Sequence, residues 1–145
     1  MPDSSFPETL PGLYLKRGLQ LMGGNEESYL KLLLKFGKNQ KDTIQKIKYC
    51  LADNDPMGAR RLIHTLTGIA GNIGADELYA SIIDLGEAIK KNRTSEWDGK
   101  TDVAQALMTQ LCASIESLAD KYNTAKESGN KEAHRAPDQD KTIDM

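Results

Sequence analysis

Residues 59–74 constrain the fold more than any other part of this chain, because their side chains sort onto two opposed faces of one helix. At about 100° per residue, the apolar side chains cluster on one side of the helix. These residues are Ala59, Leu62, Leu66, Ile69, Ala70 and Ile73. The opposite face is centred on His64 and also carries Met57, Arg60, Arg61, Thr67, Gly68 and Gly71. The segment therefore predicts an amphipathic helix that packs one face against other elements.

Two glycines share the face of His64, one and two turns further along the helix. A glycine inside a helix costs about 1 kcal/mol relative to alanine. It also removes the side chain that would keep another molecule away. Gly68 and Gly71 therefore indicate that something approaches His64 closely.

The rest of the chain predicts further helices and no strands. Apolar residues recur every three to four positions, and no segment alternates with the period of two that is typical of a strand. We expect helices over residues 12–22, 26–52, 56–73, 76–92 and 101–122. Four long amphipathic helices with short links favour an all-α fold, an antiparallel up-down four-helix bundle. The short extra N-terminal helix would cover one end of it.

Several helix ends carry their own signals. Asn25 is expected to cap the second helix, and Asp55 the third, where Pro56 suits the first helical position. Gly74 is expected to be the C-terminal cap of the third helix. Trp97, in an expected loop over residues 93–100, is interpreted as a local anchor.

Three regions follow from this pattern. Residues 12–122 are expected to form the helical domain. Residues 1–11 contain three prolines and are expected to be a linker or tether. Residues 123–145 are polar and are expected to be disordered, with an inert second histidine, His134.

Composition excludes several classes of function. The net charge of −2 gives no basic field for nucleic acid, and no apolar run is long enough to cross a bilayer. The N-terminus lacks the pattern of a signal peptide. Cys50 and Cys112 are far apart and are expected to be core residues, without a disulfide or metal ligand cluster, which fits a cytoplasmic setting. No glycine-rich phosphate loop is present, so the chain is not expected to bind ATP as a kinase does.

The face around His64 resembles the signature of histidine-containing phosphotransfer (HPt) domains. That signature is a histidine, leucine two residues later, usually lysine at the third position, glycine at the fourth, and a second small residue six positions after that. Here these positions hold His64, Leu66, Thr67, Gly68 and Gly74. Ala75, Leu78 and residues 21–25 also look like the family, and the resemblance spans about residues 10–122. Thr67 departs from it, since the family usually has lysine there.

The resemblance implies a phosphorelay intermediate. His64 would accept a phosphoryl group from an aspartate of one response-regulator receiver domain and pass it to another. Arg60 and Arg61 could offer charge-assisted hydrogen bonds to the phosphoryl group, and Thr67 a weaker hydroxyl. Gly68 and Gly71 would leave room for the partner. The chain would need no cofactor of its own, because Mg²⁺ would belong to the partner receiver.

The resemblance leaves several alternatives open. Residues 10–13 look like the stretch that leads into the C-terminal HPt module of hybrid sensor histidine kinases. The chain is therefore expected to be either the cytoplasmic part of an inner-membrane sensor kinase or a free-standing module, monomeric in isolation and without direct membrane contact. A degenerate HPt domain that docks receivers without phosphorylation is the second interpretation of its function. A purely structural bundle is the third.

Overall fold

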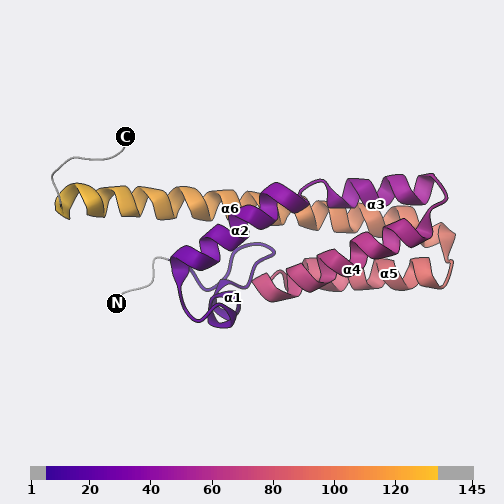
Figure 1. Ribbon diagram of the computed structural model, residues 1–145, viewed down its shortest axis with the longest axis horizontal. Helices are drawn as coiled ribbons and strands as arrows, with labels where there is room; N and C mark the ends of the chain where they lie inside the picture. The colour runs from indigo at the N-terminus through magenta and orange to yellow at the C-terminus, as the bar shows by residue number, and fades with distance from the viewer. Residues whose placement is uncertain (1–5, 134–145) are drawn as a thin grey trace.

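The computed structural model describes residues 6–133, with side chains described for residues 6–123, and this part of the chain is all-helical (Figure 1). The prediction of an all-α fold is therefore confirmed over the described residues. The elements are α1 (Leu15–Leu21), α2 (Glu26–Gln40), α3 (Thr43–Ala52), α4 (Pro56–Ile73), α5 (Asp76–Lys90), a 3₁₀ turn η1 (Thr94–Glu96) and α6 (Trp97–Ala133).

The long helix α6 runs the length of the molecule, and the other helices lie along it or against its neighbours (Figure 1). α3 packs against α4, α4 against α5, α5 against α6, and α6 against α3, so these four helices form a closed cycle of contacts. α2 crosses α6 obliquely and also touches α4. The short α1 lies at one end, against α4 and α2.

One apolar core lies inside this cycle. Every α-helix contributes fully or nearly fully buried apolar side chains to it. The largest fully buried residues include Leu15, Leu33, Ile47, Leu66, Ile82, Leu85 and Met108. Burying one such side chain contributes about 1.5–3 kcal/mol, so the core holds the helices together. The free thiols of Cys50 and Cys112 are partly buried against this core, as predicted.

The predicted N-terminal cap of α2 and both predicted ends of α4 are confirmed. The side chain of Asn25 accepts a hydrogen bond from the Ser28 amide at 2.9 Å, which caps α2. Asp55 accepts from the Gly58 amide at 3.0 Å, and proline stands at the start of α4. Gly74 ends α4 with φ of +86°, in the left-handed region that glycine adopts without strain.

The predicted single helix over residues 26–52 is wrong, because the structure breaks it into α2 and α3. The break falls at residues 41–42, and α3 begins at Thr43. The Thr43 hydroxyl donates a hydrogen bond to the side-chain oxygen of Gln40 at 2.7 Å. Short polar side chains such as those of Asp42 and Thr43 can hydrogen-bond to nearby backbone groups in place of the helical hydrogen bonds. Such residues therefore favour helix ends. The break lets α2 turn toward α1 while α3 lies along α4 (Figure 1).

The first helix begins later than predicted, at Leu15 and not at residue 12. Gly12 has φ of +79°, outside the helical region, and residues 10 and 13 pair through two backbone hydrogen bonds of 2.9 Å. The described part of the expected linker also packs on the domain. Phe6 contacts the rings of Tyr29 and Tyr122, with centroids 6.3 and 5.8 Å apart.

Two further boundaries differ from the sequence interpretation. The expected loop over residues 93–100 is a 3₁₀ turn, and α6 already begins at Trp97. α6 also continues past Tyr122 to Ala133, so the first part of the expected disordered tail is helical. The rest of that tail, His134 included, lies outside the described residues.

Candidate functional site

His64 lies near the middle of α4 with its side chain exposed. The opposite face of α4 is buried, through Ala59, Ile63, Leu66, Ala70 and Ile73. The amphipathic pattern therefore orients the helix as the sequence predicts, with one correction. Ile63, directly before His64, is buried, whereas Leu62 is only partly buried.

Two glycine positions fix the register between α4 and α5. A Cβ atom on Gly86 would lie 3.4 Å from a methyl carbon of Ile63. A Cβ atom on Gly71 would lie 3.4 Å from the ring of Tyr79. The two helices therefore run antiparallel, and the level of His64 on α4 corresponds to the level of Gly86 on α5.

His64 separates two surface hollows. One, the basic groove, has a volume of about 760 Å³ and runs between α4 and α5. Its lining includes Met57, Arg60, Arg61, His64, Ile83 and Lys90. The other, the glycine hollow, includes Arg17, His64, Gly68, Gly71 and Tyr79. His64 and Thr67 line both, so a molecule in either hollow meets the imidazole.

The structure brings all six sequence-predicted site residues to this one surface. Arg60 and Arg61 line the basic groove, Gly68 and Gly71 line the glycine hollow, and Thr67 lies beside His64 in both. Spacing of three and four residues on one helix is enough to explain this grouping.

The surface beside His64 is open at Gly68. A Cβ atom placed there would meet no other part of the described chain within 4 Å. Gly71 is less open, because its Cβ would touch the Tyr79 ring. Since Gly68 faces empty space, packing inside this chain does not require a glycine there.

Thr67 does not provide the donor that the sequence interpretation gave it. Its hydroxyl donates to the carbonyl oxygen of Ile63 at 2.7 Å, one turn back on the same helix. A hydroxyl has a single proton, so in this rotamer only oxygen lone pairs face outward. Thr67 therefore offers no hydrogen bond to an anion beside His64, and the positive charge for such an anion has to come from other residues.

Free cations line the basic groove. Among the described side chains, those of residues 6–123, Arg60, Arg61 and Lys90 form no ion pair, whereas Glu87, which also lines the groove, pairs with Lys91 at 3.5 Å. In the glycine hollow, Arg17 already forms an ion pair with Asp76. The basic groove thus carries an excess of positive charge, and the glycine hollow holds a neutral pair.

Sequence reasoning missed the residues that other helices bring to the site. Lys90 and Ile83 come from α5, and Arg17 comes from α1. Nothing in the segment around His64 indicates them, because their place depends on how the helices pack. The one available signal is periodic, since Tyr79, Ile83 and Lys90 share a face of α5 at helical spacing.

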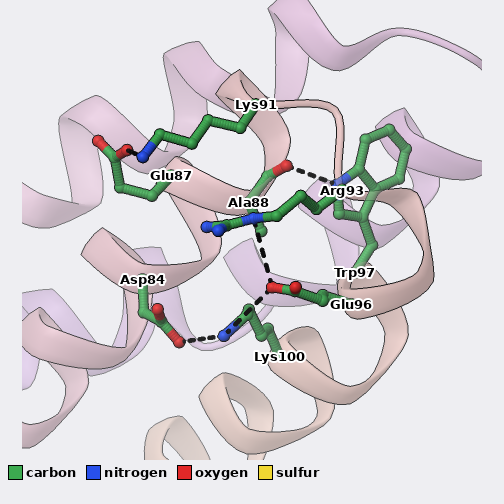
Figure 2. Close-up of polar contacts among 8 residues, drawn as sticks. All are labelled: Asp84, Glu87, Ala88, Lys91, Arg93, Glu96, Trp97 and Lys100. Carbon is green, nitrogen blue, oxygen red and sulfur yellow. Dashed lines mark hydrogen bonds and ion pairs between the residues drawn. The ribbon is translucent and has the colours of Figure 1, made fainter.

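A polar network fixes the end of α5 that carries Lys90 (Figure 2). The indole N–H of Trp97 donates to the carbonyl of Ala88 at 3.2 Å, so the predicted anchor role of Trp97 is confirmed. Lys100 bridges Asp84 at 2.5 Å and Glu96 at 3.7 Å, and the hydrogen bond to Asp84 raises the pKa of Lys100. These contacts tie α5 to the start of α6 and hold the turn between them.

Other kinds of site find no support in the described residues. The side chains that the structure describes, residues 6–123, include no group of three or more His, Cys, Asp or Glu that could hold a metal ion. No helix within residues 6–133 is long and apolar enough to cross a membrane. A scan against protein-family models and searches of curated proteins and of solved structures found no match to this chain. The functional assignment therefore depends on the site itself.

Proposed function

We propose that this chain is a phosphorelay module similar to HPt domains, with His64 as the covalent carrier of a phosphoryl group. The observation that carries the proposal is the exposed His64 at the centre of α4, between a groove with free cations and a hollow opened by Gly68. A transfer histidine has to be reached by a large partner, and this position allows it.

The proposed architecture is an antiparallel up-down four-helix bundle. The cycle of contacts among α3, α4, α5 and α6 supports it, and so does the antiparallel register of α4 and α5. In this description α2 and α3 together are the first long helix of the bundle, interrupted at residues 41–42, and α1 covers one end. His64 would then stand on the outer surface at mid-height.

The proposed reaction needs one neutral imidazole nitrogen and a phosphorylated partner. The unprotonated nitrogen of His64 attacks the phosphorus of an aspartyl phosphate on a receiver domain, and a P–N bond forms as the P–O bond to the carboxylate breaks. The carboxylate leaves with the bonding electrons, and the other ring nitrogen keeps its proton. The reverse reaction with a second receiver completes the relay. Mg²⁺ would be supplied by the receiver.

The surroundings of His64 suit this reaction. Arg60 lies one turn before His64 on the same face, where its guanidinium can donate to phosphoryl oxygens. The exposed Met57 and Ile83 add an apolar surface next to the imidazole, which suits docking of a folded partner. Response-regulator receiver domains are the proposed partners.

Label transfer from phosphorylated receivers tests the proposal. Each receiver domain of the source organism is labelled with a small phosphodonor, purified and mixed with the wild-type chain or with His64→Gln. We expect acid-labile label on the wild-type chain from at least one receiver and none on His64→Gln. Acceptance by His64→Gln at the wild-type rate would show that the carrier is wrongly assigned.

The alternative function, a degenerate HPt domain that only docks receivers, gives a different result in the same assay. The open surface and apolar residues around His64 suit docking alone equally well. Tight binding of a phosphorylated receiver without transfer of label to the wild-type chain would support docking and exclude the relay.

A further inference from the structure

We propose that Lys90, in the last turn of α5, binds the phosphoryl group on His64. It would supply the positive charge that a lysine at position 67 supplies in the usual HPt signature. The proposal rests on the proposed function of His64 as the carrier. It assigns a residue from a different helix, which the motif around His64 does not include.

The helix register places Lys90 within reach of His64. Gly86 stands level with Ile63, next to His64, and Lys90 lies four residues further along α5 on nearly the same face. That separation is one helical turn, about 5–6 Å along the axis. The four-carbon stem of a lysine spans a comparable length and is flexible. Lys90 and His64 line the same groove.

Lys90 is also free to act. Its neighbour Lys91 pairs with Glu87 at 3.5 Å, whereas Lys90 forms no ion pair with any side chain described, from residue 6 to residue 123. Arg60 lies across the groove, because the antiparallel register brings the first turns of α4 beside the last turn of α5. A phosphoryl group on His64 would therefore meet Lys90 from one helix and Arg60 from the other.

The groove needs such a charge because Thr67 does not supply one. The Thr67 hydroxyl proton is held by the Ile63 carbonyl, and Arg17 on the opposite side is paired with Asp76. The carboxylate of Glu87, which lines the same groove, is drawn toward Lys91. The cations around His64 that no described carboxylate pairs with are therefore Lys90, Arg60 and Arg61.

A small phosphodonor tests the proposal without a partner protein. Phosphoramidate transfers its phosphoryl group to an exposed imidazole: the unprotonated nitrogen attacks phosphorus, the P–N bond to the donor nitrogen breaks, and ammonia leaves. The rate of modification of His64 is followed by intact mass in the full chain. The variants are Lys90→Gln, Lys90→Arg and Lys48→Gln. Lys48 is an exposed α3 residue that does not line the groove, and its replacement changes the net charge equally.

At an exposed site, we expect Lys90→Gln to slow modification of His64 about two- to five-fold, with a smaller difference at high salt. Lys90→Arg keeps most of the rate, and Lys48→Gln matches the wild type. Adding Thr67→Lys to Lys90→Gln restores the rate, because the two lysines supply the same charge. Thermal unfolding of each variant confirms that the fold is intact.

Equal rates for Lys90→Gln and Lys48→Gln would overturn the assignment of Lys90. That result would leave the proposed function standing, since receiver-to-His64 transfer is measured separately. Failure of every receiver to label His64 would instead refute the proposed function, whatever the phosphoramidate rates are.

Discussion

Replacing Gly68 with alanine is expected to stabilise the fold while it hinders phosphotransfer. Gly68 lies inside α4 and is exposed, and a Cβ atom there would meet nothing within 4 Å. The substitution therefore adds no strain and buries no new surface. The change in the free energy of unfolding then comes from helix propensity alone, which favours alanine over glycine by about 0.8–1 kcal/mol. For a domain of this size that corresponds to a melting temperature higher by roughly 3–5 °C.

The larger Gly68→Gln variant separates stability from docking. Glutamine is also a better helix former than glycine, so the fold is expected to be as stable as the wild type or more stable. Its side chain would fill the open surface one turn from His64 and is expected to slow receiver-to-His64 transfer by about tenfold or more, since small misplacements at a reacting centre are costly.

The matched control is Gly37→Gln in α2. Gly37 is also a helical glycine with open space around it, but it lines neither hollow beside His64. We expect a similar gain in stability with no change in transfer. A lower melting temperature for Gly68→Ala would show that the open surface is misassigned. Transfer by Gly68→Gln at the wild-type rate would remove the steric argument.

Three further changes test separate parts of the account. Because Lys90 is proposed to supply the charge already, Thr67→Lys is expected to change the rate of transfer to His64 little in the wild-type chain and to raise it a few-fold in Lys90→Gln, where it restores about 0.2–1 kcal/mol of attraction for the phosphoryl charge; a few-fold increase in the wild-type chain in the label-transfer assay would show that Lys90 does not supply that charge. Gly18→Ala is expected to destabilise the fold by about 1–3 kcal/mol in urea unfolding, because its Cβ would overlap the Tyr29 hydroxyl and lie 2.6 Å from the Ile73 carbonyl oxygen. Tyr29→Phe removes the buried 2.6 Å hydrogen bond to that carbonyl and is expected to cost about 1–3 kcal/mol in the same measurement; a cost near zero would mean that water replaces the phenol.

Sequence reasoning succeeded where a local signal decides the structure. Apolar periodicity gave the all-α class, and single residues such as Asn25, Asp55 and Gly74 gave helix ends. It failed at the break between α2 and α3, because the apolar spacing of Phe36, Ile44 and Ile47 continues through the break. Periodicity reports which residues share a face, and it does not report where a helix changes direction.

The same limit applies to the candidate site. The α4 residues could be placed around His64 from their spacing alone, and the structure puts them on one surface. Lys90 and Arg17 could not be found in this way, since they reach that surface only through the packing of α5 and α1 against α4. The hydrogen bond of Thr67 to the Ile63 carbonyl is a matter of rotamer, which the sequence does not specify.

Whether this chain relays a phosphoryl group is decided by onward transfer from phosphorylated His64. The chain is phosphorylated by its cognate receiver, purified, and mixed with a second, unlabelled receiver and Mg²⁺, with Lys48→Gln as the surface control and His64→Gln as the blank. We expect the acid-labile label to leave His64 and to appear on the receiver aspartate. Label that stays on the chain, or that is found on His134 or any other residue, would contradict the claim that this chain relays a phosphoryl group through His64.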